Sequence, residues 1–334
     1  MILAWALAIS GCVRIEAGFS GDREQRPLVG QEAVRLIAAP RGTTFHDPEW
    51  LPTLGKIVFT LSPPPGDAFL MELASVAIDG SALERLPLPD EAGCKYTSKA
   101  LPEALGDVRL GYVQQCWPGG GRVVRLMAWD PRTEAARPLV PYRLLFQQGP
   151  FACSPDLSTC VINDHNGLSE QLARLGRRGL EPLDLPLERA GFPSWSPDGR
   201  WVVVDGVPEG TEGTGLDLLG VPRDLYLLSS DLEPIRLLVE DVLNVSRSAW
   251  SSDSRWLAVS LKPNRGTEGV YLLEVATGKL VLALAGRLLG GPTWLPGDAS
   301  LAVPVGTESR GSGEQDVGLY IVKLPDGWRL DRAG

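Results

Sequence analysis

The sequence predicts an all-β protein, a six-bladed β-propeller with four-stranded antiparallel blades. Three observations support this fold class. A hairpin motif recurs along the chain at intervals of roughly 40 to 55 residues, and a pair of short strands follows each copy. The 38 Gly and 28 Pro residues are interrupted by apolar runs, which marks them as turns between strands rather than as disorder.

The recurring hairpin is clearest at residues 194–204, SWSPDGRWVVV. Pro197 presets φ for the first central position of a type I turn, Asp198 tolerates the second, and Gly199 accepts the left-handed conformation that closes a bulged hairpin. The apolar run at 201–204 then lacks alternation, as expected for a strand that neighbouring blades cover on both faces.

Six copies align on this turn. They span residues 49–60, 100–113, 152–163, 194–204, 248–260 and 293–303. The aligned turn positions are Pro52, Pro102, Pro155, Pro197, Ser252 and Pro296. Trp195, Trp250 and Trp294 recur at one position before the turn, and we interpret them as residues that pack between blades rather than as a platform for a ligand.

A second element follows each hairpin and consists of a strand, a polar turn and a short strand. The copies span 69–88, 124–140, 168–185, 225–238, 270–284 and 319–330. The copy at 168–185 has leucines at nearly helical spacing, but Gly176 and Gly179 and its place in the repeat favour strands.

Two segments compete to complete the last blade. The blade is complete if its fourth strand lies at 329–331. The segment 33–40, AVRLIAAP, also reads as a strand, and by pairing beside the last blade it would close the circle and protect an edge. We assign the propeller to residues 33–334.

The N-terminal residues resemble a lipoprotein signal. Residues 1–11 are apolar and end in small residues before Cys12, which predicts a signal peptide over 1–11, lipidation of the Cys12 thiol and a tether over 12–32. No Lys or Arg precedes the apolar stretch, unlike most secretory signals. The alternative is an N-terminal strand with a coincidental cysteine. The first reading predicts a bacterial envelope protein that is lipid-anchored and faces the periplasm or the cell exterior.

Four further cysteines fit an exported protein. Cys153 and Cys160 flank one hairpin turn and face each other across it. Cys94 and Cys116 lie further out on the equivalent hairpin of the preceding copy. Both pairs are candidates for disulfides, and buried free thiols are the alternative.

The repeated Trp-Ser-Pro-Asp-Gly pattern resembles the WD40-like repeats of the TolB propeller and its relatives, including the propellers of prolyl oligopeptidases. The resemblance covers about residues 45–330 and is complete in the copy at 194–204. It implies a six-bladed propeller of the kind that acts as a scaffold or gating module. We expect no counterpart of the α/β domain that precedes the propeller in TolB, nor of the hydrolase domain of the oligopeptidases.

Charge and composition exclude some partners and chemistries. The net charge of −9 and the pI near 5.0 argue against a surface that tracks nucleic-acid phosphates, so we expect no nucleic-acid partner. Only two His residues are present, and the cysteine spacings match no zinc motif. We therefore predict no catalytic residues, no metal and no cofactor.

One face of the propeller is the expected binding surface. The loops after the second strands are long and rich in Gly or Pro, at 61–68, 117–122, 205–223 and 304–317. Polar residues directly after two second strands, Asn163, Asp164, His165 and Asp205, are candidates to line the channel mouth and bind a ligand. Capping of strand ends is the alternative explanation for these four residues.

These inferences give one leading function and two alternatives. We expect a non-catalytic envelope lipoprotein that binds a protein or peptide partner through its long-loop face and touches the membrane through its lipid anchor only. The first alternative is a small-ligand or metal-dependent hydrolase-type site at the channel mouth. The second is a purely structural spacer.

Overall fold

A computed structural model describes most of the predicted ring. The described residues are 33–40, 42–62, 71–89, 103–105, 109–116, 123–141, 147–165, 170–211, 221–286, 288–308, 315–325 and 328. The predicted signal peptide at 1–11, Cys12, the tether at 12–32 and Cys94 lie outside these residues, so those predictions remain predictions.

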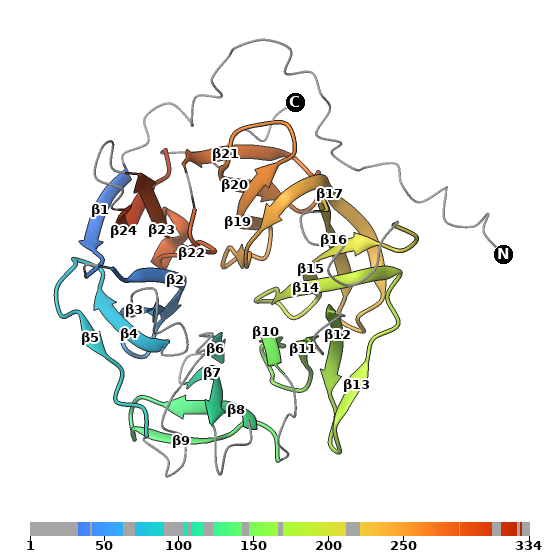
Figure 1. Cartoon of the computed structure of the whole chain (residues 1–334), viewed down its shortest axis with the longest axis horizontal. Helices are drawn as coiled ribbons and strands as arrows, with labels where there is room; N and C mark the ends of the chain where they lie inside the picture. The colour runs from blue at the N-terminus through green and yellow to red at the C-terminus, as the bar shows by residue number, and fades with distance from the viewer. Residues whose placement is uncertain are drawn as a thin grey trace.

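Antiparallel sheets are arranged in a ring around a common axis (Figure 1). The first sheet contains β2 (Thr44–Leu51), β3 (Lys56–Ser62), β4 (Glu72–Ala77) and β5 (Glu84–Arg85). The second contains β6 (Glu103–Leu105), β7 (Arg109–Cys116), β8 (Val123–Asp130) and β9 (Ala135–Pro138). The third contains β10 (Gln147–Cys153), β11 (Cys160–His165), β12 (Glu170–Leu175) and β13 (Leu180–Pro182).

A joined sheet of eight strands follows the third sheet. Its first half contains β14 (Leu187–Trp195), β15 (Trp201–Pro208), β16 (Arg223–Ser229) and β17 (Pro234–Val245). Its second half contains β18 (Ala249–Trp250), β19 (Trp256–Pro263), β20 (Gly269–Glu274) and β21 (Leu280–Ala285). The halves are joined because β17 pairs with β16 and then, at Val242–Val245, with β19.

The last sheet has the order β1-β24-β23-β22 and joins the two ends of the described chain. It contains β22 (Thr293–Trp294), β23 (Ser300–Glu308), β24 (Gln315–Lys323) and β1 (Ala33–Ala38), with a short 3₁₀ turn (Pro296–Asp298) between β22 and β23. The pairing of β1 with β24 runs from Ala33 opposite Val322 to Ala38 opposite Gly318. The prediction that segment 33–40 pairs beside the last blade is confirmed, and the competing strand at 329–331 lies outside the described residues.

The prediction of an all-β chain with four-stranded antiparallel sheets is confirmed. The segment at 168–185, for which helical spacing was the competing interpretation, forms β12 and β13. One alignment was wrong. The hairpin of the second sheet pairs Leu105 with Arg109, so its turn lies at 106–108 and not at Pro102. Pro102 corresponds instead to Pro48, which precedes the turn of the first sheet on the inner strand.

The hairpin turns are held by a repeated serine–aspartate contact. Ser196 Oγ donates to Asp198 Oδ1 at 2.7 Å and accepts from the Trp201 N–H at 2.9 Å. Ser154 and Ser251 make the same two contacts in their own hairpins. Gly199 has a φ of 71°, which confirms its predicted left-handed conformation.

The hydrophobic core lies between consecutive sheets. One cluster joins the first and last sheets through residues such as Phe45 and Leu319. The recurring tryptophans pack at such junctions, as predicted: Trp195, Trp250 and Trp294 are buried. Trp250 Nε1 donates to the Ser194 carbonyl at 3.1 Å, and Trp294 Nε1 donates to the Ala249 carbonyl at 3.0 Å. The indoles of Trp250 and Trp294 therefore each bond one unit of the ring to the preceding unit.

One predicted disulfide is present and the other is only half described. Cys153 and Cys160 are bonded across the hairpin of the third sheet, with their Cα atoms 4.0 Å apart. Cys116 is buried at the end of β7, and its predicted partner Cys94 lies outside the described residues.

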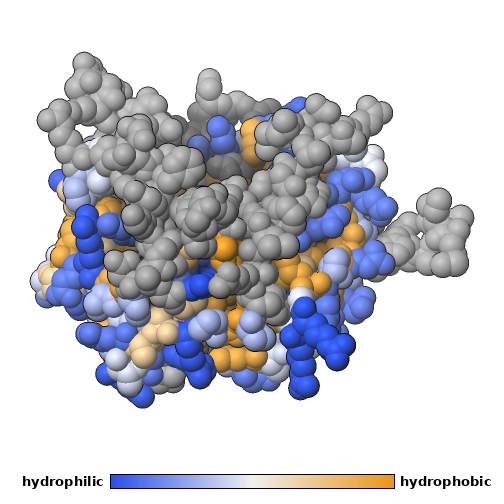
Figure 2. Space-filling view, turned by 60° about the horizontal axis from the view of Figure 1, so that its bottom comes forward, coloured by the Kyte–Doolittle hydropathy of each residue, from blue (hydrophilic) through white to orange (hydrophobic). Residues whose placement is uncertain are grey.

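Where the face in Figure 2 is coloured, hydrophilic and hydrophobic residues are interspersed. The large apolar residues that are exposed include Val34, Ile78, Leu83 and Ile235, which come from different parts of the chain. Among the described residues, no helix has the length and apolar composition that crossing a membrane requires.

Candidate functional site

A cavity of about 450 Å³ opens on the ring axis, at the face that carries the hairpin turns. Inner-strand or turn residues of every sheet line it, including four prolines in hairpin turns and four tryptophans at the ends of inner strands. The prolines are Pro52, Pro155, Pro197 and Pro296, and the tryptophans are Trp50, Trp195, Trp250 and Trp294. This volume lies within the range of clefts that hold small ligands or short peptide segments.

Two glutamates occupy the same register position on neighbouring inner strands. Glu49 follows Pro48 on β2, and Glu103 follows Pro102 on β6. The corresponding positions before Trp195, Trp250 and Trp294 hold Ser194, Ala249 and Thr293, so acidic side chains enter the cavity from the first and second sheets.

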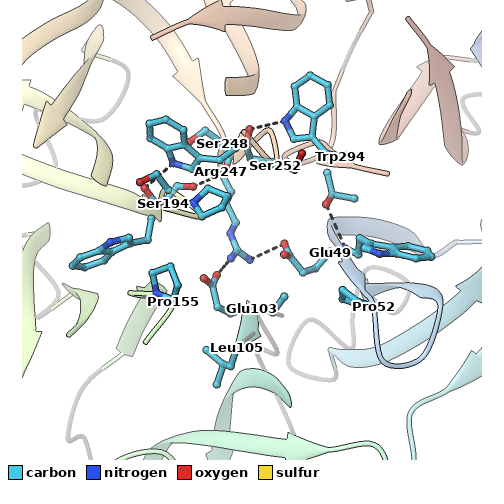
Figure 3. A pocket seen from close by; sticks show the side chains of 18 of the residues that line it. Glu49, Pro52, Glu103, Leu105, Pro155, Ser194, Arg247, Ser248, Ser252 and Trp294 are labelled. Atoms are coloured by element: carbon cyan, nitrogen blue, oxygen red, sulfur yellow. Dashed lines mark hydrogen bonds and ion pairs between the residues drawn. The ribbon is translucent and has the colours of Figure 1, made fainter. Parts of the chain in front are cut away.

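Arg247 extends toward these glutamates from another part of the ring (Figure 3). Its guanidinium forms an ion pair with Glu103 through Nη2, and Nη1 lies 4.0 Å from Glu49 Oε2. Arg247 belongs to the short segment between β17 and β18. Two glycines let the chain entering the last sheet approach here: a Cβ on Gly291 would collide with the Arg247 carbonyl, and one on Gly290 would lie 2.9 Å from the Asp47 nitrogen.

The electrostatic environments of the two glutamates differ. The pKa of Glu49 is raised above its ordinary value chiefly because burial disfavours the charged form, and Arg247 only partly opposes this. Asp47 adds a smaller contribution in the raising direction, while the Ala104 backbone acts in the lowering direction. Glu103 has the direct contact with the guanidinium. Of the two glutamates, Glu49 therefore has the weaker interaction with their shared counter-ion, Arg247.

Hydrogen bonds fix the polar wall of the cavity. Ser194 Oγ donates to the Ser248 carbonyl at 2.9 Å, and Thr293 Oγ1 accepts from the Trp50 N–H at 3.3 Å. The Asp298 carboxylate accepts from the N–H and the hydroxyl of Ser252. Since each contact joins two units of the ring, the cavity wall is built before any ligand arrives.

Asn163 and Asp205, two of the sequence-predicted candidates, lie close together but away from this cavity. Both are buried, and a Cβ on Gly191 would lie 3.2 Å from Asp205 Oδ1 and 3.4 Å from Asn163 Nδ2. The Asn163 amide donates to the Ala190 carbonyl at 2.7 Å, and Asp205 forms an ion pair with Arg223. A metal ion at Asp205 would have to compete with this guanidinium.

The other two sequence-predicted candidates, Asp164 and His165, are not part of the contact between Asn163 and Asp205. Asp164 follows Asn163 on β11, so its side chain points to the opposite face of the sheet, and it is half-buried. The backbone of His165 lies opposite Gln147 and Glu170 at the end of β11, and its side chain is not among the described ones. Within the described residues, no three His, Cys, Asp or Glu side chains gather as a metal site.

The opposite face, predicted to carry long loops, has a smaller cavity of about 210 Å³. Asp47, Lys262 and Glu268 supply its charged lining, and Phe192 and Leu288 are among its apolar residues. The predicted loops at 205–223 and 304–317 are partly strand, because β15 continues to Pro208 and β23 and β24 pair as far as Glu308 and Gln315. Those parts of the prediction were wrong.

Sequence reasoning missed Glu49, Glu103 and Arg247. The signal for the glutamates was the repeated Pro-Glu dipeptide at 48–49 and 102–103. Aligning Pro102 with the turn prolines concealed it. No local pattern marks Arg247, because its partners come from remote sheets and are brought near only when the ring closes.

A ring of radially arranged four-stranded antiparallel sheets with an axial cavity defines a β-propeller. Comparison with solved structures makes this more specific. TolB from Acinetobacter baumannii matches with a TM-score of 0.57 and 13% identity over 82% of this chain, which spans 65% of the TolB chain. The chain has a TolB-like propeller fold.

Other propellers match over most of their length. A gluconolactonase from Xanthomonas campestris gives a TM-score of 0.54 and 16% identity, covering 90% of this chain and 91% of the other. The calcium-binding protein regucalcin from Agrobacterium tumefaciens gives 0.51 and 11%, covering 90% and 96%. No family model matches the sequence, and no curated protein matches it. At these identities the likeness concerns the fold alone.

Proposed function

We propose that this protein is a non-catalytic, six-bladed propeller of the bacterial cell envelope that binds a protein or peptide partner. The blade count follows if each half of the joined sheet is taken as one blade beside the four separate sheets. Lipidation of Cys12 and the tether at 12–32 would hold the ring at the membrane, and the long-chain anchor would be its sole membrane contact.

The axial cavity is the observation that supports peptide binding best. It is concave, four prolines and four tryptophans are among its lining residues, and its few charged groups converge from different sheets. Sites of this kind bury an apolar segment and orient it by a small number of polar contacts. The interlocked turns keep the wall rigid, which lowers the entropy that binding must overcome.

Two faces of the propeller are candidates for the partner surface. The sequence pointed to the face that carries the connections after the second strands, where the 210 Å³ cavity lies. The 450 Å³ cavity lies on the hairpin face. Variants on each face show whether the partner contacts the long-connection face or the hairpin face.

Affinity capture from membranes of the native organism, with the detergent-solubilised full chain as bait, tests the proposal. We expect a partner to be recovered above the background of a Cys12→Ala bait. Deleting residues 212–220 examines the long-connection face, and Pro197→Glu examines the hairpin face, since a carboxylate on the rim disturbs the cavity. Failure of the intact bait to recover any partner would contradict the scaffold role.

The alternative is a small-ligand or hydrolase-type site at the channel mouth. Its support is the meeting of Asn163 and Asp205 at Gly191, which puts two oxygen-bearing side chains together near the ends of second strands. It predicts stoichiometric calcium in the purified protein, lost in Asp205→Ala. Metal-free protein that also fails to take up added calcium would eliminate the calcium version.

A further inference from the structure

The charges at the axial cavity do not balance. Glu49, Glu103 and Asp298 carry three negative charges when all are ionised, and Arg247 supplies one positive charge. Asp298 is held by Ser252 on the cavity wall, so the pair next to the guanidinium is Glu49 and Glu103. The guanidinium contacts Glu103 directly and lies 4.0 Å from Glu49, so the uncompensated charge is mainly that of Glu49. An enclosed, partly desolvated carboxylate of this kind attracts a second cation more strongly than a carboxylate in open water does.

The geometry around Glu49 leaves room for that cation. The side chain of Glu49 remains 22% exposed, whereas those of Glu103 and Arg247 are each 12% exposed. All three side chains line the cavity, and Figure 3 shows Arg247 directed between the two carboxylates. Arg247 itself demonstrates that this pair of carboxylates accepts a guanidinium group.

The rest of the wall suits the stem of a long basic side chain. Pro52 and Trp50 of the first sheet and Leu105 of the second also line the cavity, on the same two sheets as the glutamates. Lys and Arg bury their methylene groups against such apolar surfaces while the charged head reaches a polar partner. The cavity therefore combines apolar lining residues with acidic ones.

We propose that the axial cavity binds the basic side chain of a peptide, a lysine ammonium or an arginine guanidinium, with Glu49 as its main acceptor. This inference rests on the proposed function and names the chemistry of the partner. The Arg247–Glu103 pair is a positioning element: it directs the guanidinium mainly to Glu103, so the Glu49 carboxylate keeps only the longer contact with Arg247 and can accept a second cation.

The proposal carries a pH dependence with a definite sign. Burial raises the pKa of Glu49 above its ordinary value of 4.5, and an arriving cation would favour the ionised form. Affinity should therefore fall as the pH is lowered through the raised pKa, beginning above pH 4.5. The charged groups that face or neighbour Glu49 are Arg247, Glu103, Asp47 and, on the cavity wall, Asp298.

The experiment is an affinity selection with a defined peptide library. The full chain is incubated with N-acetylated, C-amidated hexapeptides that are randomised over all residues except cysteine, so that cations come from side chains alone. Retained peptides are sequenced by mass spectrometry, and single peptides are titrated by calorimetry. Glu49→Gln is the test variant, and Glu72→Gln on β4, outside the cavity lining, makes the same change in net charge.

We expect retained peptides to be enriched in Lys or Arg at one position. Glu49→Gln should weaken their binding about tenfold, which is equivalent to about 1.4 kcal/mol, because the charged acceptor is lost, and Glu72→Gln should leave it unchanged. Enrichment of peptides without a basic residue, or equal binding by Glu49→Gln, would overturn this inference alone. Retention of no peptide would overturn peptide binding by this cavity, whereas the proposed partner-binding function is decided separately by the affinity capture.

The wild-type pH profile provides a second measurement in case Glu49→Gln folds poorly. Titration of one enriched peptide between pH 4 and pH 8 should show affinity lost on the acidic side. The same peptide with norleucine in place of the basic residue should bind weakly at every pH. A flat profile for the basic peptide would contradict the assignment of Glu49 as acceptor.

Discussion

The fourth residue of each serine-containing hairpin turn adopts a left-handed backbone. Leu157, Gly199 and Ser254 have φ values of 59°, 71° and 57°, and Asp298 at the matching position of the last sheet has 53°. Glycine takes this conformation without steric cost, but the other three do not. Ser254 is compensated by contact with the preceding turn, because its hydroxyl accepts from the Asp198 N–H at 3.0 Å. Asp298 is compensated in the same way by Ser252.

Substitution of Gly199 measures the cost of this conformation. Gly199→Ala should lower the free energy of unfolding by about 1 kcal/mol, because a Cβ at φ 71° is strained even though its nearest neighbour, Pro155 Cδ, is 3.5 Å away. Gly179→Ala is the control, since it has no positive φ and meets nothing within 4 Å. Urea denaturation of both variants gives the comparison. Equal stability of the two would contradict a conformational origin.

At the scale of elements, the sequence predicted turn conformations better than it predicted the pairing and length of strands. The turn at 196–199 follows from Pro197 and Gly199, since each residue fixes its own φ. The turn of the second sheet was misplaced because Pro102 resembles a turn proline in sequence, whereas the pairing of Leu105 with Arg109 puts the turn after Leu105. The extension of β23 and β24 to Glu308 and Gln315 has no local signal.

Removal of the closing strand β1 should lower the stability of the ring more than removal of the residues before it. A variant that lacks residues 33–38 loses the pairing with β24 and the contacts of Leu36 and Ile37 with the cluster between the first and last sheets. We expect a lower melting temperature and a greater tendency to aggregate, because the edge of β24 becomes available to other chains. Differential scanning calorimetry and light scattering measure these effects.

A variant that lacks residues 13–32 is the matched control, since it shortens the same end of the chain and retains β1. It should keep the melting temperature of the parent. If both deletions lowered it equally, the stabilising element would lie in the tether rather than in the pairing of β1 with β24.

At the scale of the molecule, the ring brings together residues that no window of the sequence connects. The sequence repeat predicted the propeller fold and the packing role of Trp250 and Trp294, because each copy contains its own strands and turns. The axial ion pairs depend on the closed ring, where Arg247 meets side chains about 144 and 198 positions earlier. Predicting them requires the relative rotation of the sheets, which single-sequence periodicity does not contain.

These axial ion pairs should contribute to the stability of the whole ring. Arg247→Ala leaves two mostly buried carboxylates without a counter-ion, and we expect it to lower the free energy of unfolding by about 3 kcal/mol. Adding Glu103→Gln should restore part of the loss, because one of the two stranded charges is removed. Arg255→Ala is the control: its side chain is 39% exposed and pairs with Glu274 at 3.3 Å, so its removal should cost under about 1 kcal/mol. Denaturant unfolding of the four proteins decides the matter, and an Arg247→Ala variant as stable as Arg255→Ala would show that the axial charges do not hold the ring together.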